Sequence, residues 1–193
     1  MAPLGPHEPP SGGRASRIFL AALLTIVMLA VLAHPVVRPD IHQALAQAPQ
    51  GQNVTYITGC TNITSPGRYV VSTNITGVQG TGYCIGVFAG DVVLYGDGHW
   101  LTGSWNGVVG GFGIYVGPGS TNVTIEDVAV ASYSTGIVVR SSGVRVVDST
   151  VGYNILYGVY VNGSNDSLIN SDISDDSVNI FVTGSNDTIV NST

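Results

Sequence analysis

The chain contains no lysine and few charged residues of any kind. Of its 193 residues, six are basic, all of them arginine, and twelve are acidic. Six arginines cannot form the basic surface that a nucleic-acid-binding protein presents, and a coiled coil would need many more Glu, Lys and Arg residues. Disorder is excluded as well, because 44% of the residues are hydrophobic and the mean hydropathy is +0.33. With 26 glycines and many valines, the chain is instead prone to form β-structure.

The N-terminal segment has the pattern of an export signal. Arg14 and Arg17 precede an apolar run over residues 18–33, as in a signal peptide. Small residues suited to cleavage follow at Ala46 and Ala48. The alternative is an uncleaved membrane anchor, although the run is shorter than the ~20 residues of a typical spanning helix. Both interpretations place the rest of the chain outside the cytoplasm, secreted or at the cell surface.

These features predict three regions. Residues 1–48 are expected to be a signal peptide or membrane anchor, residues 49–58 a linker, and residues 59–193 the folded domain. Contact with a membrane is expected only through the N-terminal segment.

Two cysteines, Cys60 and Cys84, fall early in the expected domain. In an oxidising compartment they are predicted to form one disulfide. The alternative is a pair of buried free thiols. A Cys/His metal site lacks ligands, since His99 is the only histidine after residue 48.

The chain carries eight Asn-x-Ser/Thr sequons. One interpretation is an N-glycosylated surface protein. The other is that Asn, Ser and Thr collect in repeated turns. Both stay open at this point. The acceptor positions are Asn53, Asn62, Asn74, Asn122, Asn162, Asn165, Asn186 and Asn191.

Internal repetition is the most informative feature of the sequence. A short apolar element recurs at residues 113–116, 136–139, 158–161 and 179–182, and a second element recurs around Ile125, Val146, Leu168 and Ile189. Both elements keep the same nearly constant step, and apolar residues alternate within each of them. A repeat of about 22 residues without a helical pattern indicates a solenoid built from short strands and bends.

The repeat predicts an all-β fold, a right-handed, single-stranded parallel β-helix with about 22 residues and several short strands per coil. The leucine-rich repeat has a similar period, but its signature is absent. Right-handedness follows from the general rule for parallel crossovers. About five coils are expected, ~4.8 Å apart. The pairs expected to stack in the core are Ile137 and Val139, Val159 and Val161, and Ile180 and Val182.

The stretch from Cys60 to Gly103 resembles the first coils of NosD-like or carbohydrate-binding/sugar-hydrolase (CASH) β-helix proteins. The resemblance rests on Cys60, residues 67–71, residues 82–85 and residues 91–99, and it extends roughly over residues 58–193. It is strongest to cell-surface β-helix proteins of archaea. It implies a pectate-lyase-like architecture, a fold that hosts lyases, hydrolases, epimerases, adhesins and structural proteins.

Two acidic groups are candidate sites. Aligned coils would place Asp127, Asp148, Asn170 and Asn191 in one turn column, where Asp127 and Asp148 could bind calcium or act in catalysis. The alternative is a solvent-exposed Asn/Asp ladder. The second group, Asp172, Asp175 and Asp176, could perform glycosidase acid/base chemistry, or it could be a solvated loop. No cofactor other than this calcium ion is expected.

An outward strip of Tyr115, Val138, Tyr160 and Phe181 is predicted on one sheet face. It could stack on sugars or bind another chain, with Trp100 and Trp105 extending it. The alternative is that the rings stabilise the sheet by cross-strand contacts.

The last seven residues begin a coil that does not finish. We expect either a truncated reading frame or an open end that stacks on a partner. The leading functional hypothesis is an exported structural or adhesive cell-surface module with weak carbohydrate binding along Tyr115, Tyr160 and Phe181. Its partners would be a carbohydrate or another surface protein, and no nucleic acid. The rival is a polysaccharide-active lyase, hydrolase or epimerase, or a fragment of one.

Overall fold

The computed structural model describes residues 54–78, 82–104 and 111–193. The expected signal or anchor segment, the sequon at Asn53 and Trp105 lie outside these residues. Among the described residues, no helix has the length and hydrophobicity that a membrane span requires.

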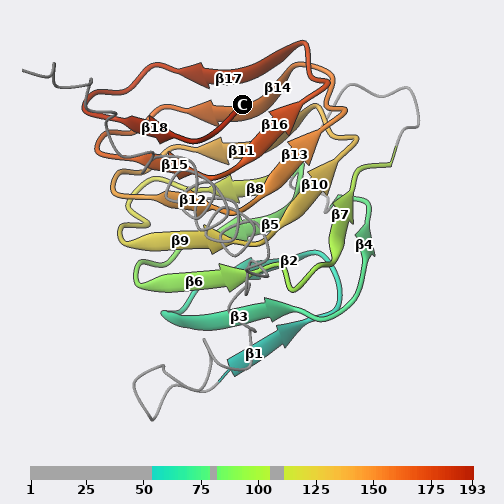
Figure 1. The fold of residues 1–193 in the computed structure, drawn as a ribbon. Coiled ribbons are helices and arrows are strands. Elements are labelled where there is room, and N and C mark those ends of the chain that lie inside the picture. Colours follow the sequence, from blue (N-terminus) through green and yellow to red (C-terminus); the bar gives the residue numbers. More distant parts are fainter. Residues whose placement is uncertain (1–53, 79–81, 105–110) are drawn as a thin grey trace, which may run out of the picture. The chain divides into compact units, whose positions relative to one another are not determined.

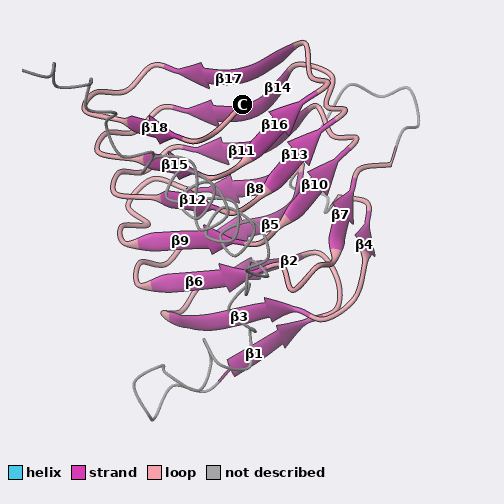
Figure 2. Cartoon of the chain, in the orientation of Figure 1, coloured by secondary structure: helices cyan, strands magenta, loops and turns pink. Residues whose placement is uncertain are grey.

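The described residues form eighteen strands in three parallel sheets (Figures 1 and 2). Sheet A contains β1 (Val54–Ile57), β3 (Gly67–Val71), β6 (Val92–Tyr95), β9 (Val123–Glu126), β12 (Arg145–Val147), β15 (Ser167–Ile169) and β18 (Thr188–Val190). Sheet B contains β2 (Thr61–Ile63), β5 (Tyr83–Val87), β8 (Phe112–Val116), β11 (Thr135–Val139), β14 (Tyr157–Val161) and β17 (Val178–Val182). Sheet C contains β4 (Ile75–Thr76), β7 (Trp100–Thr102), β10 (Ala129–Ala131), β13 (Thr150–Gly152) and β16 (Asp172–Ser174).

This arrangement confirms the predicted parallel β-helix and its coil length of about 22 residues. From β3 onward the chain visits sheets A, C and B in turn. In the regular coils each residue pairs with its equivalent in the next coil, as Val146 does with Leu168. There are about six coils, one more than expected. Part of the expected linker belongs to the β-helix, because Val54–Ile57 form β1 and pair with β3. The right-handed sense stays a prediction.

Left-handed backbone conformations make the corners between the sheets. Twelve non-glycine residues have φ between 49° and 63°, a region that Asn, Asp and Gly tolerate best. All but Asp97 fall into three columns, one at each corner of the coil. Each corner is named by the two sheets that it joins in chain order, so the B–A corner leads from a strand of sheet B to the next strand of sheet A. The B–A corner has Asp91, Asn122, Asn165 and Asn186, together with Gly143 at φ 72°; the A–C corner has Asp127, Asp148, Asn170 and Asn191; the C–B corner has Ser132, Tyr153 and Asp175. The Asn- and Asp-rich turns of the sequence therefore follow from the path of the backbone.

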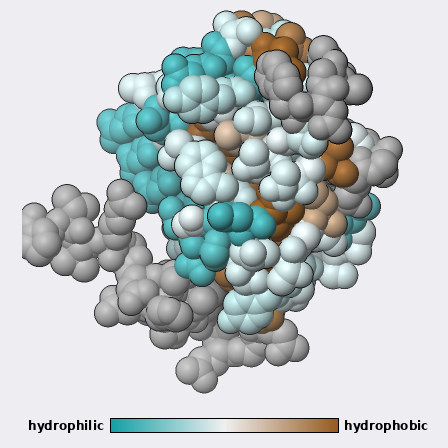
Figure 3. Space-filling model, turned by 90° about the vertical axis from the view of Figure 1, so that its right-hand side faces the viewer, coloured by the Kyte–Doolittle hydropathy of each residue, from teal (hydrophilic) through white to brown (hydrophobic). Residues whose placement is uncertain are grey.

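Branched aliphatic side chains from all three sheets fill the interior, as the alternation predicted. Ile125, Val130 and Ile137, one from each sheet, are fully buried. The predicted core residues Val139, Val159 and Val161 are also buried, whereas Ile180 is half-buried and Val182 is 38% exposed. These last two lie in the final coil of the described residues. On the face shown in Figure 3, hydrophobic residues form small separate groups among more polar ones.

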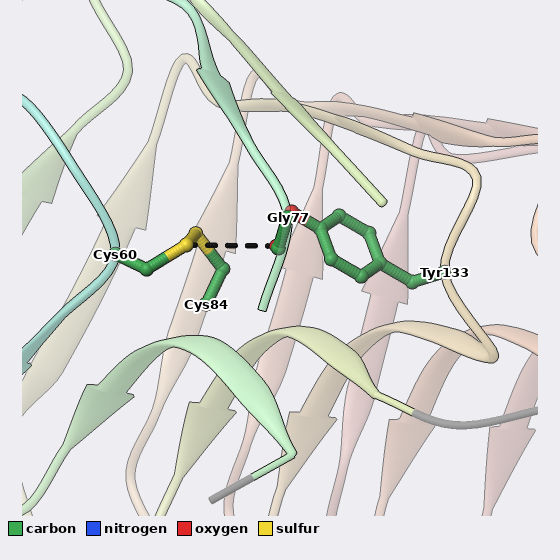
Figure 4. Close-up of a disulfide and its surroundings, with 4 residues drawn as sticks. All are labelled: Cys60, Gly77, Cys84 and Tyr133. Atoms are coloured by element: carbon green, nitrogen blue, oxygen red, sulfur yellow. Dashed lines mark hydrogen bonds between the residues drawn. A yellow bond between two sulfur atoms is a disulfide. The ribbon is translucent and has the colours of Figure 1, made fainter. Parts of the chain in front are cut away.

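The predicted disulfide between Cys60 and Cys84 is present. Because Thr61 pairs with Ile85 in register, the two cysteines are direct neighbours in adjacent coils. Cys60 Sγ lies 3.5 Å from the carbonyl oxygen of Gly77, which also accepts a 3.1 Å hydrogen bond from the Tyr133 hydroxyl (Figure 4). The disulfide thus lies beside a buried tyrosine that reaches back from a later coil.

In the next three coils, glycines occupy the column that holds the disulfide in the first two coils. Gly113, Gly136 and Gly158 stand in register with Cys84. A β-carbon on Gly136 would lie 2.7 Å from the carbonyl oxygen of Gly158 and 2.9 Å from Asn154 Nδ2, so the coils approach too closely for a side chain.

Gly136→Ala should lower the free energy of unfolding by about 1–3 kcal/mol, the usual cost of overpacking. Gly59→Ala is the matched control, since no atom lies within 4 Å of its added β-carbon. Chemical denaturation of both variants measures the difference. Equal stability of the two would contradict the close approach of the coils at Gly136.

Replacing both Cys60 and Cys84 by Ala should destabilise the fold by about 3 kcal/mol, because their sequence separation of 24 closes a loop of that size in the unfolded chain. Denaturation under oxidising conditions measures the loss. A reducing agent should bring the wild type close to the variant and leave the variant unchanged. A wild type that is no more stable when oxidised would argue against this contribution.

Candidate functional site

Seven aromatic rings gather on the outer side of sheet B. They come from β5, β8, β14 and β17, with one more residue directly after β5, and they account for every ring pair found among the described residues. The rings fall into two groups. The first, called cluster 1, is Tyr83, Phe88, Phe112 and Tyr115; the second, cluster 2, is Tyr157, Tyr160 and Phe181.

The rings of cluster 1 pack over Gly86, which has no side chain. Tyr83 and Tyr115 stack with centroids 5.4 Å apart and an interplanar angle of 13°. Gly86 pairs with Tyr115, and its added β-carbon would lie 2.5 Å from the Tyr83 ring and 2.6 Å from the Phe88 ring. Glycine at this position therefore lets both rings lie over the backbone. Phe88 remains 41% exposed.

Cluster 2 joins stacked rings to a cation. Tyr160 and Phe181, which pair in register, stack at 5.6 Å with an interplanar angle of 16°. Tyr157 lies 5.2 Å from Phe181, centroid to centroid. The guanidinium carbon of Arg140 lies 5.7 Å from the centroid of Tyr160, within the range of a cation–π interaction. Phe181 is 38% exposed.

The aromatic strip is not continuous. The predicted column of Tyr115, Val138, Tyr160 and Phe181 exists in register, but Val138 is only 3% exposed and separates the two clusters. Rings of adjacent coils stack on one another, so part of their surface serves the sheet itself. Trp100 lies on β7 in sheet C and does not extend the strip.

The predicted turn column of Asp127, Asp148, Asn170 and Asn191 lies at the A–C corner. Asp127 and Asp148 have φ of 51° and 50°, and both side chains are exposed. Further along the column, Asn191 Nδ2 donates to Asn170 Oδ1 at 3.1 Å. Backbone conformation accounts for these residue types. Within the described residues, no three His, Cys, Asp or Glu side chains come together as metal ligands.

The other acidic candidates have three different partners. Asp176 Oδ1 accepts from the backbone N–H of Asn154 at 2.6 Å, and Asp172 Oδ1 accepts from the Thr193 hydroxyl at 3.3 Å. A hydrogen bond to Asp175 raises the pKa of Tyr153. Burial raises the pKa of Asp176. Asp176 therefore belongs to a backbone contact between coils, and only Asp172 and Asp175 are exposed.

The sequence interpretation missed two acids in the interior column of sheet A, of which Asp166 is buried and Asp187 is half-buried. Asp166 and Asp187 stand where the preceding coils have Val123 and Val144. Asp166 is 4% exposed, and its Oδ1 accepts from the backbone N–H of Val144 at 2.7 Å. Asp187 Oδ1 accepts from the N–H of Asp166 at 2.9 Å. Each carboxylate thus joins its coil to the coil before.

The two acids share a repeated local sequence that could have identified them. Gly-Ser-Asn-Asp occurs at residues 163–166 and again at 184–187. The buried Oδ2 atoms of Asp166 and Asp187 have no hydrogen-bond partner. Burial raises the pKa of Asp166, and the neighbouring Asp187 carboxylate raises it further, against the lowering effect of the Val144 and Gly143 N–H groups.

The final coil of the described residues has several apolar side chains at its surface. β16, β17 and β18 are each the last strand of their sheet. Val178, Phe181, Ile189 and Val190 in this coil are all more than a third exposed.

Comparison of the chain with protein-family models, curated proteins and solved structures finds no match.

Unfolding should cost more free energy at mildly acidic than at neutral pH. The pKa values of Asp166 and Asp176 are raised above the ordinary 3.8 in the folded state, so the native protein binds protons more readily than the unfolded chain. Stability is then fully present below the unfolded pKa and is lost as pH rises through the folded pKa. Asp166→Asn keeps an acceptor for Val144 but cannot ionise.

Chemical denaturation at a series of pH values from 4 upward measures the free energy of unfolding. Asp166→Asn should make this free energy less dependent on pH. Asp148→Asn, an exposed corner residue, controls for the change in net charge. A wild-type stability that rises steadily from pH 4 to pH 7 would show that Asp166 and Asp176 do not dominate the pH dependence of stability.

Proposed function

We propose that the protein is an exported cell-surface module whose β-helix is a scaffold for a binding face on sheet B. The face consists of clusters 1 and 2 with Arg140, and its ligand is a carbohydrate or a carbohydrate-bearing surface protein. One observation carries the proposal: all the paired aromatic rings of the described residues, and a guanidinium group over one of them, lie on the outer side of one sheet.

The chemistry of this face suits a sugar. Aromatic rings contact the C–H groups of a pyranose, while tyrosine hydroxyls and a guanidinium supply hydrogen bonds to its oxygens. The exposed parts of Phe88 and Phe181 offer the apolar contact, and Arg140 is exposed next to Tyr160. Stacking within the clusters holds the rings in place before a ligand arrives, which reduces the entropic cost of binding.

Export is supported by the disulfide and by the N-terminal sequence pattern. Disulfides persist in oxidising compartments and are rare in the cytosol. The Cys60–Cys84 bond lies between the first coils, where it stabilises one end of the scaffold.

Within the described residues, several acidic candidates for the rival enzymatic function have structural roles. A glycosidase needs two carboxyl groups placed on either side of one bond. Asp176 is engaged with the backbone of the neighbouring coil, and Asp127 and Asp148 occupy corner positions that favour Asp for its backbone conformation. Scaffold and binding therefore account for more of the structure than catalysis does.

Glycan-array screening of the folded domain, followed by titration of the sugars that bind, tests the binding face. Phe181→Ala and Arg140→Ala should each weaken binding about tenfold, the equivalent of about 1.4 kcal/mol. Tyr56→Ala is the control, because Tyr56 is 64% exposed on β1, in a different sheet. Sugars that bind both variants as tightly as the wild type, or no binding across the array, would contradict a carbohydrate face on sheet B.

A further inference from the structure

The B–A corner holds three of the sequon asparagines at equivalent places. Asn122, Asn165 and Asn186 occupy left-handed positions in this column, and all three side chains are exposed. The other two members of the column are Asp91 and Gly143. The backbone conformation explains why Asn occurs here, since Asp and Gly fit the same requirement.

Backbone conformation does not explain why a Ser or Thr hydroxyl occurs two residues after each of these three asparagines. That position faces outward on sheet A, and its in-register column reads Val93, Thr124, Arg145, Ser167 and Thr188. Valine and arginine are accommodated there, so the column has no general need for a hydroxyl. Nevertheless Thr or Ser follows each Asn, and neither follows Asp91 or Gly143.

The A–C corner provides an internal comparison. It has the same left-handed geometry, with Asp127, Asp148, Asn170 and Asn191. Here the residues two places later are Ala129, Thr150, Asp172 and Thr193. A hydroxyl follows an Asp, and one Asn is followed by an acid, so turn chemistry alone does not pair Asn with Ser or Thr. The strict pairing is a property of the B–A corner.

We propose that the B–A corner is an N-glycosylated edge, with glycans on Asn122 and on Asn165 or Asn186. The glycan donor is a lipid-linked oligosaccharide phosphate. Asn Nδ2 forms a bond to C1 of the first sugar, the bond from C1 to the phosphate oxygen breaks, Nδ2 loses one proton and the lipid phosphate leaves. The hydroxyl of the third residue positions the amide for this transfer in the unfolded or folding chain.

The folded corner accommodates the product. Asn122 Nδ2 donates to Asp91 Oδ1 at 2.7 Å, and one N–H remains for this bond after a sugar is attached. Asn165 and Asn186 are in adjacent coils, where the N–H of Asn165 donates to the Ser185 carbonyl at 2.9 Å. Their ~4.8 Å spacing leaves room for one glycan of the pair, whereas Asn122 is two coils from Asn165, ~9.6 Å away.

The test is glycopeptide mass spectrometry of the full chain purified from the cells that produce it. Three variants made in the same cells accompany the wild type. Asn122→Asp and Thr124→Val each remove the sequon. Both introduce a residue type that already occurs at the equivalent position one coil earlier, Asp91 and Val93 respectively. Thr124→Ser keeps the sequon. Thermal unfolding of each variant reports on the fold.

The expected result is a glycan on the Asn122 peptide of the wild type and of Thr124→Ser, and its complete loss in the other two variants. Once glycans are removed, both Thr124 variants should unfold at the wild-type temperature. Asn122→Asp should unfold at a lower temperature, because it loses the hydrogen bond to Asp91 and places two carboxylates next to each other. Thr124→Val that unfolds at a much lower temperature would overturn the inference, since the hydroxyl would then have a structural role. If the corner peptides are unmodified in protein that has formed the Cys60–Cys84 disulfide, the proposed glycosylation is overturned but the proposed export is not. If the corner peptides are unmodified and Cys60 and Cys84 are free thiols, both the proposed glycosylation and the proposed export are overturned.

Discussion

Coil-to-coil hydrogen bonding in register is the constraint on which the rest of the structure depends. Every strand pairs in parallel with the equivalent strand one coil away, so each coil must repeat the path of its neighbour. The path can close into three sheets only if the backbone turns sharply at the corners, and left-handed residues supply those turns. Small amide and carboxylate side chains meet this requirement, which gives the chain its many Asn, Asp and Gly residues.

The same constraint decides which side chains remain for function. Interior positions are filled by Val, Ile and Leu, and the acids that enter the interior, Asp166 and Asp187, hold backbone N–H groups of the preceding coil. Corner acids such as Asp127 and Asp148 are explained by φ. Only the outer sheet faces and the exposed corner side chains are free of these tasks. Sheet B uses its face for aromatic clusters, and the B–A corner carries the strict Asn-x-Ser/Thr pairing.

Periodicity made the fold predictable and made the sites ambiguous. A nearly constant step with alternating apolar positions identified the parallel β-helix, and in-register partners such as Ile137 and Val159 followed from it. The same repetition multiplied every candidate site, because a residue type needed at one corner recurs at all of them. Asp166 escaped notice because the two preceding coils have valines, Val123 and Val144, at the equivalent position, and its burial depends on the coil that precedes it.

The sequence by itself determined the all-β class, the coil length and the core columns, because these depend on regular spacing along one chain. It also predicted the disulfide between Cys60 and Cys84, because these are the only two cysteines of a chain with an export pattern. Only the tertiary structure decided that Val138 is covered and splits the aromatic strip, that Tyr83 stacks on Tyr115, and that Trp100 belongs to another sheet. These facts depend on contacts between coils. The space around a side chain is set by residues a full coil away in the sequence, and a local pattern contains no record of them.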